Sequence, residues 1–271
     1  MNPHRILNLF SSVLEEIKLL KYETSIFDVF KFILMHFNRK RKFKIKSDLL
    51  NFYEIINFII DEISPKLLLK GKIATVCLDY TKMISTNELK NKVIVDVGSW
   101  KGDSILLFHN FGAKKIIAYE PIIENVKSAK RIIDKFKINC EIYPYAVCSK
   151  DGNLTFFVEE EKIGGGDLSL LENKRENLKK IKVKCISFEK VIRKAVKENC
   201  YLMKVDCEGC EKFLLDIDDK LIKKIPRWII ESHSFEISKK LCKNFIKNGF
   251  YLKKIYYYNP PELLIFSFSR K

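Results

Sequence analysis

The chain has 271 residues, of which 47% are hydrophobic, and its 50 lysines and arginines against 34 aspartates and glutamates give a net charge of +16. This length allows one α/β domain and an appendage of about 70–90 residues, and the apolar content excludes a disordered chain. No run of about 18 uncharged apolar residues occurs, so no membrane-spanning helix is expected. The positive charge suits nucleic acid, anionic lipid or an acidic substrate, but a lysine-rich composition typical of heat-adapted organisms also accounts for it.

The first third of the chain is predicted to be helical. Residues 1–90 are expected to form a helical appendage, and residues 91–271 a separate α/β domain. The appendage contains a basic run from Arg39 to Lys46, which is expected to stay exposed because burying so many unpaired cations is costly. The N-terminus lacks the cleavage site of a signal peptide. We therefore expect a cytoplasmic protein, with peripheral contact to anionic lipid through the basic run left open.

From residue 92 the pattern alternates between strands and helices, which is typical of a mostly parallel sheet with helices on both faces. The expected strands are 93–97, 115–120, 140–146, 201–206, 227–232, 250–257 and 263–269. The expected helices lie near 102–111, 122–136, 209–216 and 235–248. Asn259-Pro260-Pro261 joins the last two strands and is too short for a crossover helix, so these strands are expected to pair antiparallel.

An insertion at 151–195 separates the third and fourth parallel strands. It opens with a turn signal at Asp151-Gly152-Asn153 and contains two strand-like segments, 154–158 and 181–186, around a glycine-rich loop at 164–169. The segment is expected to form a small β-ribbon. It could serve as a lid over a ligand site or be a surface hairpin without a role.

The most informative segment is a buried strand that runs into a glycine turn, a helix and a second strand ending on an acid. Asp96, Gly98 and Gly102 mark the turn, and Glu120 ends the second strand. A nucleoside cofactor needs this layout, because the turn lets backbone approach the ligand and the acid meets the ribose. Asp96 and Lys101 stand where a dinucleotide fingerprint would have glycines, and no Gly-Lys-Ser/Thr follows for a triphosphate. The pattern suits S-adenosylmethionine, although an ordinary strand–turn–helix remains an alternative.

A second segment carries three acids at a strand end. Asp206, Glu208 and Glu211 follow the apolar residues of the fourth parallel strand, and Gly209 allows a sharp exit into a helix. In open parallel sheets, ligands bind beyond the carboxyl ends of the strands where the strand order reverses. Asp206 is therefore expected to lie near Asp96 and Gly98. The alternative is a solvated helix start favoured by the helix dipole.

His233 lies just past the end of the fifth parallel strand. Its unperturbed pKa of about 6.5 suits a general base for a hydroxyl or amine nucleophile. At this strand end it is expected to face the same opening as Asp206. A hydrogen-bonded histidine with a purely structural role is the alternative.

The eight cysteines are dispersed and flanked by apolar residues, so they are expected to be mostly reduced thiols in the core. Cys207 and Cys210 have the spacing of a redox or metal pair, but no second pair or histidine cluster completes a zinc site. No metal is expected.

Together these motifs resemble the FkbM-type methyltransferases, a family with the Rossmann-like class I methyltransferase fold that uses S-adenosylmethionine. The residues that carry the resemblance are 96–102, 119–121, 146–147, 151–152, 204–211 and 231–233. The string Lys204-x-Asp206-x-Glu208-Gly209-x-Glu211 is its most specific part. Trp100 departs from the family, which often has Asn there, and the helical front section lies outside the pattern.

The resemblance implies roles for individual residues. Those expected to bind the cofactor are Asp96, Gly98, Ser99, Gly102, Asp103, Glu120, Pro121, Ala146 and Asp206. Glu120 would accept hydrogen bonds from the two ribose hydroxyls, and Ala146 with Pro121 would line the adenine pocket. His233, Asp206 and Glu208 are the expected catalytic residues, because a hydroxyl acceptor must lose its proton during attack.

The expected activity is O-methylation of a small molecule, sugar or lipid. RNA methylation is one alternative, supported only by the charge. A non-catalytic membrane-surface protein that uses the basic front helices is the other.

Overall fold

The computed structural model describes residues 80, 83–85, 87–159, 178–258 and 263–270. The chain divides into two compact units, Met1–Lys72 and Ile73–Lys271, and every described residue belongs to the second. The predicted front helices, the Arg39–Lys46 run, the glycine-rich loop at 164–169 and the turn at 259–261 lie outside the described residues. The division of the chain at residue 90 stays a prediction.

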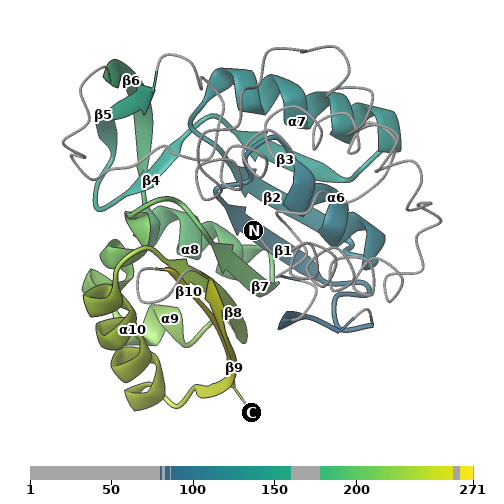
Figure 1. The fold of residues 1–271 in the computed structure, drawn as a ribbon. Coiled ribbons are helices and arrows are strands. Elements are labelled where there is room, and N and C mark those ends of the chain that lie inside the picture. The colour runs from purple at the N-terminus through teal and green to yellow at the C-terminus, as the bar shows by residue number, and fades with distance from the viewer. Residues whose placement is uncertain (1–79, 81–82, 86, 160–177, 259–262, 271) are drawn as a thin grey trace, which may run out of the picture. The chain divides into compact units, whose positions relative to one another are not determined.

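A seven-stranded sheet organises this unit, in the order β3-β2-β1-β7-β8-β10-β9 (Figure 1). Its strands are β1 (Val93–Val97), β2 (Lys115–Tyr119), β3 (Cys140–Tyr143), β7 (Cys200–Val205), β8 (Arg227–Ser232), β9 (Tyr251–Tyr258) and β10 (Leu263–Ser269). The pairs from β3 to β8 are parallel, and β10 runs antiparallel to both of its neighbours. The predicted Rossmann-like sheet with one antiparallel strand is confirmed.

The strand order reverses between β1 and β7. The strands that follow β1 are added on one side of this point, and those that follow β7 on the other. The helices are α6 (Asp103–Asn110), α7 (Ile123–Phe136), α8 (Phe188–Lys197), the 3₁₀-helix η4 (Cys210–Asp216), α9 (Asp219–Ile222) and α10 (Phe235–Lys247). Figure 1 shows α6 and α7 along the half of the sheet that holds β1 to β3, and α10 along the half that holds β8 to β10. In this class of fold, ligands bind beyond the carboxyl ends of the strands at a point where the strand order reverses.

Helix α8 was not predicted, and most of it lies within the segment 151–195 that was expected to be a β-ribbon. Its apolar residues Phe188, Val191, Ile192 and Ala195 are buried at helical spacing. The side chain of Ser187 caps the helix by accepting a hydrogen bond from the backbone N–H of Lys190. The segment predicted as a helix at 209–216 is a 3₁₀-helix that begins one residue later.

The predicted third strand at 140–146 is two strands. β3 ends at Tyr143, and Ala146 begins β4 (Ala146–Cys148), which belongs to a second sheet with β5 (Gly152–Glu159) and β6 (Leu178–Ser187). β5 and β6 pair antiparallel, which confirms the predicted ribbon (Figure 1). Asp151 holds the base of the ribbon, because its carboxylate accepts the backbone N–H of Ser187 at 2.9 Å.

The two faces of the large sheet differ in polarity near its carboxyl edge. One face contributes Val97, Val205 and Ile230 to the main hydrophobic core, which α8 and α10 complete. Since side chains alternate along a strand, the residues between these apolar ones point to the other face. There the strands carry Asp96 and Lys204, both buried. Buried charges in apolar strands mark this face as the place to look for a site.

Among the described residues, no helix has the length and apolar content needed to cross a membrane.

Candidate active site

The turn after β1 brings the backbone against the end of β7. Gly98 has a φ of +82°, and a Cβ at this position would lie 1.7 Å from the carbonyl oxygen of Asp206. Gly102, just before α6, has a φ of +97°, and a Cβ there would lie 2.9 Å from Cα of Ala129 in α7. Only glycine fits both the backbone conformation and the space at these two positions. The predicted closeness of Gly98 and Asp206 is therefore a direct backbone contact.

Asp96 and Lys204 form a buried ion pair beneath this turn. Nζ of Lys204 lies 3.2 Å from Oδ1 of Asp96 and donates a hydrogen bond of 2.6 Å to the carbonyl oxygen of Gly98. Oδ2 of Asp96 accepts the hydroxyl of Ser104 at 2.5 Å, which ties β1 to α6. Burial raises the pKa of Asp96, opposed by the charge of Lys204. Asp103 begins α6, and its carboxylate accepts the backbone N–H of Ser104.

Glu120 holds together the loops that follow β1 and β2. Its Oε2 accepts the backbone N–H of Trp100 at 3.0 Å, and its Oε1 accepts the backbone N–H of Ile122 at 3.0 Å and Nδ2 of Asn125 at 3.1 Å. Burial raises the pKa of Glu120 to about 7, against these hydrogen bonds, which lower it. Each carboxylate oxygen has two lone pairs, so the group keeps acceptor capacity for a ligand.

Two buried polar atoms beside these loops lack a hydrogen-bond partner among the described residues. They are Oγ of Ser99, in the turn after β1, and Oδ1 of Asn125, in the first turn of α7. Buried polar groups are nearly always satisfied, so unsatisfied ones beside these loops fit a polar ligand. Pro121 is half-buried, and Ala146 packs with Ile122 in one apolar cluster. The predicted cofactor residues around Glu120 are thus brought together.

A second group gathers around His233, at the ends of β7 and β8. Its Nε2 lies 3.3 Å from Glu208, 3.9 Å from Asp206 and 3.9 Å from Glu231, and its Nδ1 lies 3.4 Å from Glu211. The backbone N–H of His233 also donates to Glu211 at 3.0 Å. The side chain of His233 is 13% exposed. The structure therefore brings the three predicted catalytic residues into one acidic cluster.

The neighbouring acids control the protonation of His233. Burial alone would lower the pKa of His233, but the hydrogen bonds and charges of Glu208 and Glu211 raise it well above its usual value. Burial raises the pKa of Glu208, against the hydrogen bond from His233. Burial also raises the pKa of Glu231 to about 8, with the neighbouring charge of Asp206 acting in the same direction. The neighbouring acids therefore favour the protonated form of His233.

Tyr80 reaches the same cluster from the segment before β1. Its hydroxyl lies 2.7 Å from Oδ2 of Asp206 and 2.7 Å from Oε2 of Glu231, and the residue is 2% exposed. The ring of Tyr80 lies under the ammonium group of Lys204, 5.3 Å from the ring centroid. Lys204 thus links the glycine turn to the cluster, because it also lies 3.3 Å from Asp206.

The turn that carries Glu208 is cross-linked. Cys207 and Cys210 form a disulfide across Glu208 and Gly209, and Cys148 in β4 is bonded to Cys185 in β6. The expectation of reduced thiols was therefore wrong for these four cysteines, because the tight turn and the neighbouring strands bring their Cα atoms to 5.4 and 6.0 Å. Cys140, Cys200 and Cys242 are free.

The ligand atoms of Asp206, Glu208 and His233 lie within 4.8 Å of one another, close enough to share one metal ion. Acidic clusters with such spacing are common without a metal, and nothing else in the described part of the chain points to one. The expectation that the protein uses no metal stays a prediction.

Three members of the site received no role from the sequence. Lys204 and Glu231 belong to motifs that carry the family resemblance, and their interruption of apolar strands was a further signal. Tyr80 gave none, because it precedes the first recognisable strand in a region predicted to be a separate appendage.

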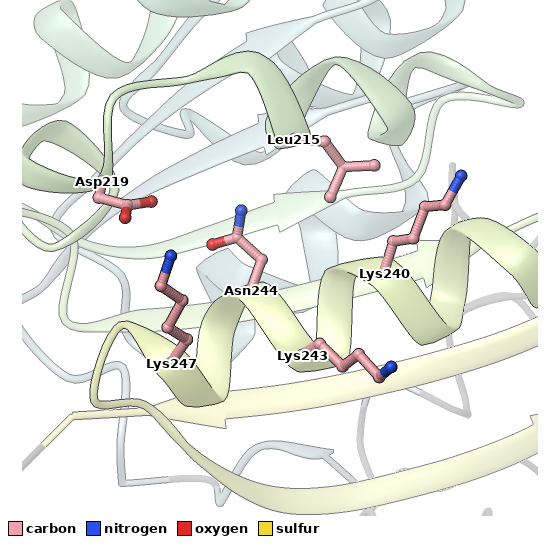
Figure 2. A pocket seen from close by; sticks show the side chains of 6 residues that line it. All are labelled: Leu215, Asp219, Lys240, Lys243, Asn244 and Lys247. Atoms are coloured by element: carbon pink, nitrogen blue, oxygen red, sulfur yellow. The ribbon is translucent and has the colours of Figure 1, made fainter.

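A cavity of about 400 Å³ lies elsewhere, on the surface formed by η4, α9 and α10 (Figure 2). It is lined by Leu215, Asp219, Lys240, Lys243, Asn244 and Lys247. None of these residues belongs to the His233 cluster or to the loops around Glu120. This cavity is therefore not the candidate active site.

A family of known proteins matches a segment of this chain that contains both Glu120 and His233. The family model described as the Methyltransferase FkbM domain matches residues 96–254, more than half of the chain. No curated protein sequence matches.

Solved structures with a similar fold include an Aeropyrum pernix fibrillarin with bound S-adenosyl-L-methionine, with 10% identity, a TM-score of 0.43 and coverage of 78% of this chain and 76% of that chain. A putative RNA methyltransferase of Pyrococcus horikoshii has 13% identity, a TM-score of 0.42 and coverage of 75% and 88%. An rRNA methylase of Streptococcus thermophilus has 12% identity, a TM-score of 0.40 and coverage of 77% and 94%. Likeness at this level concerns the fold only.

Proposed function

Because the chain belongs to the FkbM methyltransferase family, we propose that it is an S-adenosylmethionine-dependent enzyme that methylates a hydroxyl group of a small molecule, sugar or lipid. The observation that carries the proposal is the joining of two groups of residues at the carboxyl edge of the sheet. The loops around Glu120 offer a cofactor site, and the acidic cluster around His233 offers a place to take up a proton. Lys204 contacts both groups.

The cofactor site is proposed to consist of the loops after β1 and β2 with the end of β7. When bound, S-adenosylmethionine supplies a methyl group on a sulfonium, which is already a strong electrophile. Oε2 of Glu120, which has one free lone pair, accepts a ribose hydroxyl, while Pro121 and Ala146 line the adenine side. The backbone at Gly98 and Gly102, with Ser99 and Asp103 at the start of α6, receives the methionine end.

Asp96 and Asp206 complete the site from the strands. Asp96 supports the turn from below through Ser104 and Lys204. Asp206 lies at the end of β7, where it can orient the cofactor's amino group or the acceptor. The buried, unsatisfied atoms of Ser99 and Asn125 support a polar ligand in this place.

The cluster is proposed to receive the acceptor's proton. The acceptor oxygen forms the new bond to the methyl carbon, the electron pair of the broken bond stays on sulfur, and the hydroxyl proton passes to Nε2 of His233 or to Glu208 beside it. Because Glu208 and Glu211 hold the pKa of His233 well above its usual value, they favour its protonated form. The rate is therefore expected to rise with pH as the fraction of neutral His233 grows.

The first test is cofactor binding followed by methyl transfer. Calorimetry should detect micromolar binding of S-adenosylmethionine and of S-adenosylhomocysteine to the whole protein. Methyl-labelled cofactor should then be incubated with panels of sugars, lipids, small hydroxylated molecules and RNA. Absence of binding would rule out the enzyme proposal. Labelling confined to RNA would show that RNA is the acceptor, in place of a sugar, lipid or small molecule.

The charge of +16 keeps RNA as a second candidate acceptor. The non-catalytic alternative, a protein that binds anionic membranes through Arg39–Lys46, would show salt-sensitive sedimentation with vesicles but no cofactor binding. A cytoplasmic location, with membrane contact as a peripheral feature, remains part of the proposal.

A further inference from the structure

Tyr80 lies outside the segment that matches the family, 96–254, and yet its hydroxyl is in the middle of the candidate active site. Two carboxylates approach this hydroxyl at the same distance of 2.7 Å, Asp206 from β7 and Glu231 from β8. The residue is 2% exposed, so water does not compete for these contacts.

The register of the sheet explains why the two acids are neighbours. Lys204 of β7 pairs with Ile229 of β8, so two residues further along Asp206 comes beside Glu231. Side chains two apart on a strand share one face, and both acids therefore point to the face where Tyr80 lies. Adjacent buried carboxylates repel each other unless a proton or a donor lies between them.

The number of available hydrogens decides which group donates and which accepts in these contacts. A phenol has one hydrogen, so Tyr80 can donate to only one of its two neighbours. The other carboxyl must itself carry a proton and donate it to the phenol oxygen. The pKa of Glu231 is raised to about 8 by burial, whereas the pKa of Asp206 is lowered, against burial, by the charge of Lys204. Glu231 therefore donates to Tyr80, and Tyr80 donates to Asp206.

The same contacts orient both acids toward His233. Tyr80 engages Oδ2 of Asp206 and Oε2 of Glu231, and the remaining oxygens, Oδ1 and Oε1, each lie 3.9 Å from Nε2 of His233. One hydroxyl thus fixes the rotation of two carboxyl groups around the proposed base.

Tyr80 is held in place from the opposite end of β8. The guanidinium of the buried Arg227 donates to the carbonyl oxygen of Met83 and to Glu88, each at 2.8 Å. The segment before β1 is therefore anchored at the start of β8, and Tyr80 reaches the end of the same strand. A side chain that is already held in place loses little further conformational entropy when it positions its neighbours.

We propose that Tyr80 is a positioning residue of the acceptor site, whose hydroxyl joins Asp206 and Glu231 into one hydrogen-bonded chain and turns both toward His233. The proposal rests on the proposed function, because the acceptor is taken to meet His233. Tyr80 acts through the two acids rather than on the acceptor itself.

The test replaces Tyr80 by Phe in the whole protein, with Tyr201→Phe as the matched control. Tyr201 also donates to a glutamate, Glu88 at 3.3 Å, but outside the cluster. Infrared difference spectra recorded during a pH titration follow the protonated carboxyl groups without cofactor or acceptor. In Tyr80→Phe the titration of Glu231 should move downward by about one pH unit, because its protonated form loses the phenol oxygen that accepts its hydrogen bond. The Tyr201→Phe titration of the cluster should match the wild type.

A second variant keeps the proposal open to refutation if Tyr80→Phe does not fold. Glu231→Gln retains a donor to the phenol oxygen, so it should fold, and it should remove the carboxyl signal that titrates near pH 8, while the signal of Glu120 remains. An unchanged titration in Tyr80→Phe, or a signal near pH 8 that survives in Glu231→Gln, would overturn the proposal. Binding of S-adenosylhomocysteine, measured separately by calorimetry, tests the proposed function instead, and its failure would leave the infrared result standing.

Discussion

The two halves of the candidate site are held in different ways. Around Glu120 the carboxylate is bound by backbone N–H groups of the loops on either side, so local chain geometry fixes it. Around His233 the contacts join side chains from β7, β8 and the segment before β1, so the register of distant strands fixes them. The first half is built to hold a ligand in a set shape. The second gathers charge and shares protons, and its properties should change with pH.

The largest effect is expected at His233, and it distinguishes the two halves of the site. His233→Ala should lower kcat by about 10²–10⁴-fold, the usual contribution of a positioned base, while the Kd of S-adenosylhomocysteine stays within about twofold. Steady-state kinetics and calorimetry measure the two quantities. His109→Ala, on α6, serves as the control. An equal loss of cofactor affinity would place His233 in the cofactor half.

The next effect tests whether the turn after β1 is fixed by space or by backbone conformation. Gly98 and Gly249 have nearly equal φ values, +82° and +83°, but a Cβ meets the carbonyl of Asp206 only at Gly98. Gly249→Ala should therefore lose about 1–3 kcal/mol of unfolding free energy from backbone strain alone. Gly98→Ala should lose more, in urea denaturation, and should also weaken cofactor binding. Equal losses would show that the close approach to β7 is unimportant.

A smaller effect is expected at Glu120. Glu120→Ala removes the proposed acceptor of a ribose hydroxyl, and it should weaken binding of S-adenosylhomocysteine by about 1.5–3 kcal/mol. Glu124→Ala, at an exposed position of α7, should leave the affinity unchanged. Calorimetry on both variants decides the matter, and unchanged affinity in Glu120→Ala would move the ribose contact elsewhere.

The pH dependence of stability should distinguish the cluster from the loops. His233 has a raised pKa in the folded protein, so its contribution to stability is complete below its unfolded value, near 6.5, and is lost as pH rises through the folded pKa. The difference in unfolding free energy between wild type and His233→Ala should therefore shrink as pH rises from about 6.5. Denaturant melts across this range measure it, and a difference that grows with pH would contradict the assignment.

The smallest effect is an expected absence of change. A chelator should alter neither methyl transfer nor cofactor affinity, because the cluster is proposed to act through its protons. Dialysis against a chelator, followed by addition of Mg²⁺ or Mn²⁺, provides the comparison. Activity that is lost and then restored by metal would make Asp206, Glu208 and His233 ligands instead.

The sequence alone identified the parts of the site that are local in the chain. The strand at 93–97, the glycine turn and the acid that ends β2 lie within one short stretch, and each has a recognisable signature. Asp206, Glu208 and His233 were found because each follows a strand end, where parallel sheets collect their functional residues.

The parts that were missed depend on packing between distant segments. Nothing around Tyr80 indicates that its hydroxyl meets two acids more than a hundred residues later. The two disulfides likewise follow from a tight turn and from the pairing of β4 with β6, neither of which cysteine spacing reveals. The strand at 140–146 was read as continuous although it changes sheets after Tyr143.

The position of Arg227 bears on how short a working version of this protein could be. Its guanidinium donates three hydrogen bonds to described residues, and all three partners lie outside the matched segment 96–254: Glu88, the carbonyl of Met83 and the carbonyl of Phe268. A fragment trimmed to the matched segment would leave a buried cation without these partners, at a cost of several kcal/mol. The family segment is therefore not expected to fold on its own here, and a minimal fragment should include Met83, Glu88 and Phe268.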